Sequence, residues 1–152
     1  MITTIRGRKV ISREAESELA SIAKLHGGLL GDIPNPHSKV RTIMVDRNRR
    51  EETICYMRHT GLGKGLLQVA IRPQLGRDVD AAVLSVPGVS PHLNKNFPKN
   101  PRLVFNSNFS AYKNKGDEPS RGEHFGWCYS LNVSEGFESF DQFMSEFIGT
   151  CP

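Results

Sequence analysis

Lysine and arginine are the residues of this sequence whose types and spacing point most directly to a chemical task. Residues 33–115 carry fourteen of them against five Asp and Glu, whereas residues 116–152 carry one against seven. Clustered cations neutralise phosphates and release counterions, which supplies much of the affinity of proteins for nucleic acid. The sequence therefore predicts a polyanion-binding face built from the middle of the chain. The predicted contacts are Arg41, Arg47, Arg49, Arg50, Arg58, Lys64, Arg72, Lys95, Lys99 and Arg102.

Asparagine and phenylalanine lie between these charges in the proline-rich segment 91–102 and just after it. Amide groups can hydrogen-bond to bases, and aromatic rings can stack on unpaired ones. Proline has no amide donor and cannot join a central strand ladder, so we expect 91–102 to be a loop that extends the basic face. The competing interpretation is a solvated surface whose charge is neutralised by the acidic C-terminal helix.

Histidines supply a second possible chemistry. His59 lies beside Arg58, and Glu123 adjoins His124. Imidazole titrates near neutral pH and can transfer protons, while arginine or lysine can stabilise the charge that develops on a phosphate. His59, His124 and Glu123 are therefore candidate catalytic groups of a small metal-independent nuclease. Whether the protein is an enzyme stays open at this point.

Two sequence patterns resemble metal or nucleotide motifs but have the wrong spacing. Cys55 with His59, and His124 with Cys128, are ligand types that zinc uses. Residues four apart on a straight strand are about 13 Å apart, which one zinc ion cannot span. The segment GLGKG at 61–65 lacks the spacing of a phosphate-binding loop. We therefore expect no metal and no cofactor, and a hairpin turn at 61–65.

The elements that would position these residues follow from hydrophobic periodicity. Apolar residues recur at helical spacing over 12–26 and again over 139–149, with Ser12 and Ser139 as the expected N-caps. Short apolar or alternating runs predict strands at 40–45, 52–59, 66–72, 102–106 and 124–132. Weak alternation over 2–11 indicates a short strand, and another short apolar run lies at 80–86.

Length and composition bound the fold class. The chain has 152 residues, is 38% hydrophobic and 24% charged, and has a formal net charge of +4. These values are typical of one globular domain. Consecutive strands with short connections favour antiparallel pairing. We therefore expect a single α+β domain over 1–152, with a mainly antiparallel sheet of five or six strands flanked by an N-terminal and a C-terminal helix.

Partners and location follow from the same features. The chain has no apolar run near the roughly 20 residues of a membrane helix, no signal-like N-terminus, and three cysteines without a disulfide-type pattern. We expect a cytoplasmic protein that does not contact membranes and whose partner is nucleic acid, either DNA or RNA. The remaining alternative is a protein-interaction module of the immunity type, in which the acidic helix or the basic sheet meets an oppositely charged protein.

Overall fold

The computed structural model describes residues 2–5, 8–31, 40–47, 50–58, 64–94, 100–106, 109, 112 and 125–150, with side chains from residue 12 onward except at 40, 46, 47, 50 and 51. The helices within these ranges are α1 (Arg13–Leu25), α2 (Pro73–Leu84) and α3 (Glu138–Thr150). The strands are β1 (Ile2–Ile5), β2 (Arg8–Ile11), β3 (Leu29–Leu30), β4 (Val40–Arg47), β5 (Arg50–Arg58), β6 (Leu66–Ile71), β7 (Val89–Pro91), β8 (Leu103–Phe105) and β9 (Phe125–Asn132).

A seven-stranded sheet forms the centre of the fold. Its strands follow the order β3-β4-β5-β6-β9-β7, and β8 pairs with β9 as well. All of these pairs are antiparallel. Strands β1 and β2 form a separate two-stranded hairpin. The predicted α+β class with an antiparallel sheet is therefore confirmed. The sheet exceeds the expected five or six strands because β3 and β7 are only two and three residues long, too short to show a period.

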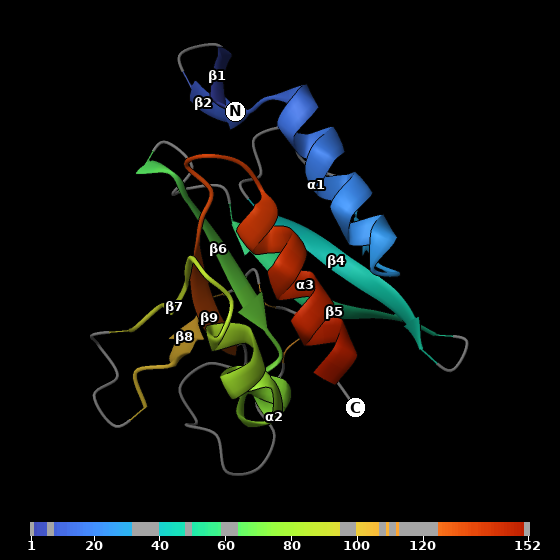
Figure 1. Ribbon diagram of the computed structural model, residues 1–152, viewed down its shortest axis with the longest axis vertical. Coiled ribbons are helices and arrows are strands. Elements are labelled where there is room, and N and C mark those ends of the chain that lie inside the picture. Colours follow the sequence, from blue (N-terminus) through green and yellow to red (C-terminus); the bar gives the residue numbers. More distant parts are fainter. Residues whose placement is uncertain are drawn as a thin grey trace.

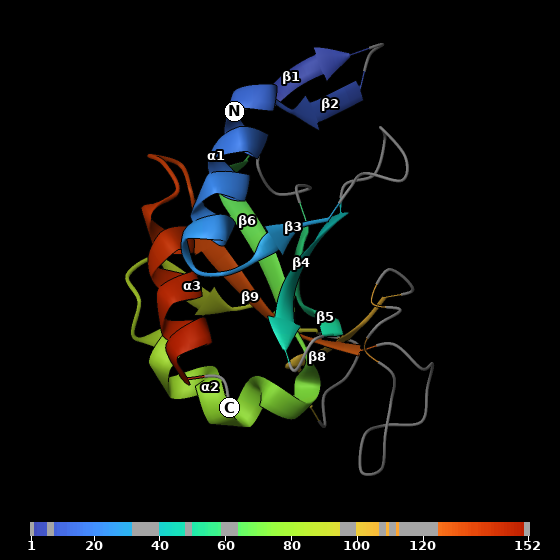
Figure 2. The ribbon, with the colours of Figure 1, turned by 90° about the vertical axis from the view of Figure 1, so that its right-hand side faces the viewer.

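The three helices lie on one side of the sheet and build the main core with it (Figures 1 and 2). Helix α3 contributes four fully buried side chains: Phe140, Phe143, Met144 and Phe147. They recur at the three- and four-residue spacing that places side chains on one face of a helix. Helix α1 contributes Leu19 and Ala23, and its C-cap His26 contacts Asp141 of α3 at 2.6 Å.

Helix α2 is the helix that the sequence analysis does not predict. Its last turns fall on the apolar run 80–86. Pro73 stands at its start, where the missing amide costs nothing, but its N-cap residue Arg72 makes no side-chain cap bond. The usual start signal is therefore absent. Val79 and Val83 are fully buried, so tertiary packing stabilises this helix.

The two predicted caps have different outcomes. Ser12 caps α1, because its Oγ accepts a hydrogen bond from the backbone amide of Ala15 at 3.2 Å. The prediction for Ser139 is wrong: α3 already begins at Glu138. The Ser139 hydroxyl instead donates to the backbone carbonyl of Asn132 at 2.7 Å, which joins the start of α3 to the end of β9.

The opposite face of the sheet carries a second, smaller apolar cluster. It consists of Tyr56, Ala70 and Cys128 from three adjacent strands, covered by Phe109 and Tyr112. The Tyr112 hydroxyl donates to the carbonyl of Ala70 at 3.3 Å. This face is thus apolar toward one end of the strands. None of the helices in the described part of the chain is long and apolar enough to cross a membrane.

Gly76 allows α2 to approach the sheet closely. A Cβ at this position would lie 2.5 Å from Cδ2 of Trp127. Real Cβ atoms do not approach that closely, so a side chain here must displace either the indole or the helix. Trp127 is partly buried and packs against the main core.

Gly76→Ala is expected to destabilise the protein by about 1–3 kcal/mol, the usual cost of overpacking a filled core. Denaturant-induced unfolding followed by Trp127 fluorescence measures the change. The matched control is Gly149→Ala, since Gly149 is also helical and its Cβ would meet nothing within 4 Å. The control should be neutral or stabilising by up to about 1 kcal/mol. Equal effects of the two substitutions would contradict the close contact at Trp127.

Candidate nucleic-acid interface

Five of the ten predicted phosphate contacts have described side chains, namely Arg41, Arg58, Lys64, Arg72 and Arg102. The other five side chains and all three candidate catalytic residues lie outside the described set, so nothing is concluded about those eight side chains. Those eight residues are Arg47, Arg49, Arg50, Lys95, Lys99, His59, Glu123 and His124. The backbones of Arg47 and Arg50 are described and pair where β4 ends and β5 begins. The binding and catalytic roles assigned from sequence stay predictions. The structure does show how the five described cations are partnered.

Arg41 lies on β4 and is 3% exposed. Its Nε and Nη2 both donate to Oε1 of Glu16, each at 3.0 Å. This buried ion pair ties the sheet to α1. A guanidinium so enclosed and neutralised has little to offer a phosphate in solvent.

Arg72, at the end of β6, is also paired with a carboxylate. Its Nη1 lies 2.6 Å from Oε1 of Glu52 on β5, and its guanidinium carbon lies 5.9 Å from the centre of the Tyr112 ring. The side chains of Arg72 and Glu52 are each 30% exposed. The pair therefore reaches solvent as a roughly neutral unit.

Arg102 belongs to a polar cluster on the helix side of the sheet. Its Nη1 and Nη2 donate to the two carboxylate oxygens of Asp80 at 3.2 and 2.9 Å. The same carboxylate accepts from Tyr129 Oη at 2.8 Å and from Trp127 Nε1 at 3.3 Å. The guanidinium stacks over both rings, with its carbon 4.6 Å from the Trp127 centre and 5.0 Å from the Tyr129 centre. This cluster fastens α2 to β9.

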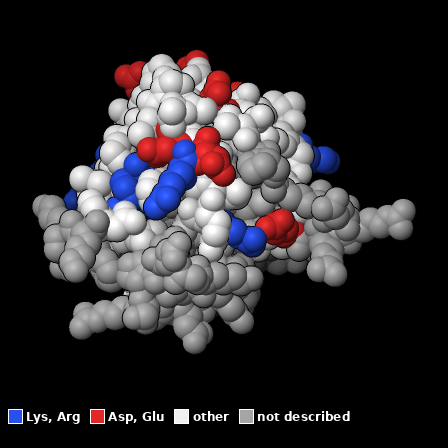
Figure 3. All heavy atoms as spheres, turned by 90° about the horizontal axis from the view of Figure 1, so that it is seen from below, with Lys and Arg blue, Asp and Glu red and all other residues white. Residues whose placement is uncertain are grey.

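Seen from below, the blue cationic side chains lie largely beside red carboxylates (Figure 3). Three of the predicted contacts form ion pairs, namely Arg41–Glu16, Arg72–Glu52 and Arg102–Asp80. Pairing of this kind was the competing interpretation of the basic segment. For these three residues the neutralising groups come from α1, β5 and α2, however, and not from the acidic C-terminal helix.

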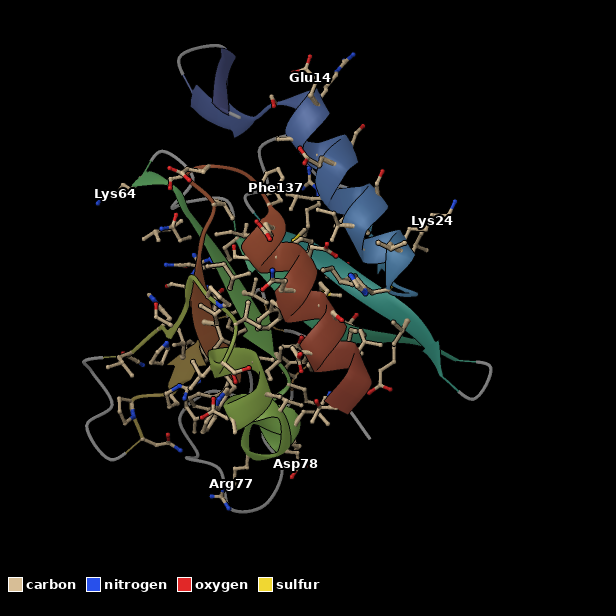
Figure 4. The ribbon with its side chains drawn as sticks, in the orientation of Figure 1. Glu14, Lys24, Lys64, Arg77, Asp78 and Phe137 are labelled. Carbon is tan, nitrogen blue, oxygen red and sulfur yellow. The ribbon has the colours of Figure 1, made fainter. Side chains whose placement is uncertain are left out.

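Arg58 and Lys64 are the two predicted contacts without a carboxylate partner among the described residues. Lys64 is exposed just before β6, at the end of the molecule away from Arg77 and Asp78 of α2 (Figure 4). Arg58 is half-buried at the end of β5.

Strand register places Arg58 in a polar row that crosses four adjacent strands. Arg58 pairs with Gln68 on β6, Gln68 with Ser130 on β9, and Ser130 with Ser90 on β7. Cross-strand partners point to the same side of a sheet, and neighbours one residue away, such as Val69 and Tyr129, are fully buried in the main core. The row therefore lies on the face opposite the helices.

A small hollow opens next to this row. Arg58, Gln68, His92, Val104 and Cys128 are among its lining residues. Its free space is about that of one water molecule. Nε of Arg58 is buried and, among the residues that the structure describes, has no hydrogen-bond partner.

His92 is held at the rim of the hollow by β9. Its backbone amide donates to the carbonyl of Cys128 at 3.1 Å, and its ring Nδ1 lies 3.5 Å from Oγ of Ser130. Burial, together with the positive charge of Arg58, lowers the pKa of His92 below its ordinary value. The imidazole is therefore neutral at pH 7 and can offer one N–H as a donor.

The two cysteines that the structure describes, Cys55 and Cys128, have thiols that are not poised for metal binding or nucleophilic attack. Burial raises the pKa of Cys128 to about 12, although Arg58 and Arg102 oppose the shift. Burial likewise raises the pKa of Cys55 far above its ordinary range. Both cysteines are free thiols. Across the described part of the chain, no three His, Cys, Asp or Glu side chains gather as a metal site.

The sequence analysis did not select Gln68, Ser90, His92 or Ser130. Gln68 and Ser130 stand at alternate positions of strands whose other face is apolar, which is the signal that could have marked them as one polar face. Nothing local in the sequence joins His92 to Arg58. That proximity arises only from the pairing of β7 with β9.

Asp80→Asn is expected to destabilise the protein by roughly 1.5–3 kcal/mol at pH 7, since it weakens charge-assisted hydrogen bonds. Burial alone would raise the Asp80 pKa, but the hydrogen bonds from Arg102, Tyr129 and Trp127 outweigh it and lower the pKa. A carboxylate with a lowered pKa stabilises the fold fully above its unfolded pKa of about 4 and loses that stabilisation as the pH falls toward the lowered value.

The stability difference between wild type and Asp80→Asn should therefore shrink between pH 7 and pH 3, as measured by urea unfolding at each pH. Asp78→Asn, an exposed neighbour on the same helix, is the control and should change stability by less than about 0.5 kcal/mol. A difference that stays constant with pH would show that the Asp80 charge does not stabilise the cluster.

Comparisons of the chain with protein-family models, with curated proteins and with solved structures found no match. The chemistry of the interface is therefore inferred from its own geometry. That geometry consists of a polar row across four strands, a half-buried arginine without a carboxylate partner among the described residues, and a neutral histidine beside it.

Proposed function

We propose that this protein binds nucleic acid across the face of the sheet opposite its helices. The observation that carries the proposal is the row Arg58, Gln68, Ser130 and Ser90, which the strand register lines up on four adjacent strands. Cation, amide and hydroxyl groups are those that contact phosphates, sugars and base edges. Known modules that bind RNA on a sheet face bind single strands, whose bases are accessible, so a single strand is the proposed form.

The distribution of charge supports the same orientation. Residues 33–115, which supply β4 through β8, carry the excess of Lys and Arg. The helix layer carries exposed carboxylates instead, including Glu14 and Glu18 of α1 and Glu138 and Glu146 of α3. A polyanion is repelled by that layer, so the opposite face is the side that it can approach.

Pairing with carboxylates reduces the set of residues on which this proposal depends. Arg41, Arg72 and Arg102 are assigned mainly to holding the fold, and Arg58 and Lys64 to the contact with phosphates. The nuclease with His59, His124 and Glu123 and the immunity-type module stay predictions, because no observation on the described residues favours either. We also propose that the protein is located in the cytoplasm.

The test is a gel-shift titration with mixed-sequence single-stranded DNA and RNA at several salt concentrations. Arg58→Gln should weaken binding about tenfold and reduce the slope of log affinity against log salt by roughly one, the signature of one lost phosphate contact. Arg77→Gln removes the same charge from an exposed site on α2 and should leave both values nearly unchanged.

Two results would overturn the proposal. One is no salt-sensitive binding of any single- or double-stranded probe by the wild-type protein. The other is equal loss of affinity in Arg58→Gln and Arg77→Gln, which would indicate attraction to net charge without a defined face.

A further inference from the structure

We infer that the hollow beside Arg58 is a binding site for one phosphate group, held by Arg58, Gln68 and His92, with Ser130 orienting the His92 ring. The inference deepens the proposed function and rests on it in one respect, because the phosphate is taken to belong to the bound strand. The group that the hollow would bind is an oxyanion. A phosphate within the strand and a phosphate at its end both supply this group.

The first support is the unmet hydrogen-bonding capacity of Arg58. Its Nε is buried and lacks an acceptor among the residues described. Nε of Arg102 shares this property, but the Arg102 guanidinium is already neutralised by Asp80 through two hydrogen bonds. Arg58 has no such carboxylate in the described structure. Nε itself is out of reach of solvent, so an anion would meet the rest of the guanidinium, since Arg58 is only half-buried.

The second support is the composition of the lining. The hollow has an arginine, an amide and an imidazole as its polar groups, and no carboxylate is among its lining residues. The remaining titratable group, the Cys128 thiol, stays protonated because burial raises its pKa to about 12. The other lining residues include Val69, Ala70, Val104 and Phe109, so Arg58 is the only charged group in the lining and its positive charge favours an anion.

The third support is the arrangement of His92 and Ser130. Ser130 Oγ lies 3.5 Å from Nδ1 of His92. A hydroxyl that donates to Nδ1 places the imidazole proton on Nε2, which makes Nε2 the donor of the ring. The space fits about one water-sized group. One phosphate oxygen can therefore enter while the rest of the group remains at the surface beside Gln68.

The experiment is a heteronuclear NMR titration of the full chain with inorganic phosphate and, separately, with sulfate, observing the Arg58 Nε–H and the ring signals of His92. Both anions should shift these signals saturably. Sulfate, unlike phosphate, keeps the same charge near neutral pH. Signal shifts in the sulfate titration therefore come from the protein groups alone. Arg58→Gln should reduce affinity at least tenfold, Arg58→Lys should reduce it less, and His92→Ala should reduce it severalfold. Arg77→Gln should bind as wild type does.

Far-UV circular dichroism and thermal unfolding verify each variant, and if Arg58→Gln does not fold, Arg58→Lys and His92→Ala carry the test. A further arm compares an oligonucleotide with and without a 5′-phosphate. If the phosphorylated strand binds more tightly and produces the same Arg58 and His92 shifts, the hollow binds a terminal phosphate. If both strands bind equally and produce those shifts, the hollow binds a phosphate within the strand.

The inference and the proposed function fail separately. Suppose that oligonucleotides bind, but that oligonucleotides, phosphate and sulfate all leave the Arg58 and His92 signals unchanged. The proposed phosphate site is then wrong, and the proposed function survives. If inorganic phosphate binds at Arg58 but no oligonucleotide binds, the phosphate site is supported and the proposed function is wrong.

Discussion

The register between β6 and β9 is the constraint on which the rest of this structure depends. It pairs Val69 with Tyr129 and Gln68 with Ser130, so that the first pair enters the core under the helices and the second faces away from it. A shift of one residue would exchange the two faces. The phenylalanines of α3 fix the choice, because Tyr129 packs against Phe143 with ring centroids 5.4 Å apart. Core packing on one side thereby sets the chemistry on the other.

Ion pairing then divides the arginines into two kinds. Arg41, Arg72 and Arg102 each meet a carboxylate on a different element, so their charge holds α1 against the sheet, the end of β6 beside β5, and α2 beside the segment before β8. Breaking such a partly buried pair leaves one charge uncompensated, which costs more than the pair itself contributes. Arg58 stands apart because it faces a lining without carboxylates. Counting cations along the chain cannot separate these two kinds.

The sequence predicts the α+β class, α1 with its Ser12 cap, the apolar face of α3 and most long strands, because each has a strong local period. It does not predict α2, whose start has no side-chain cap at Arg72, or the two- and three-residue strands β3 and β7. Arg58 and Lys64 were selected as candidate contacts from charge alone. Their companions Gln68, His92 and Ser130 could not be found in that way, since only the pairing of β9 with both β6 and β7 brings them together.

The most direct test of the central claim maps where a nucleic-acid strand touches the protein. Backbone amide shifts recorded with and without a short single-stranded oligonucleotide would locate the contact on the fold. The account predicts that the largest changes lie on β5, β6, β7 and β9 around Arg58, Gln68 and Ser130, with α1 and α3 nearly unaffected. Changes concentrated on the helix layer, with the strands unperturbed, would contradict it.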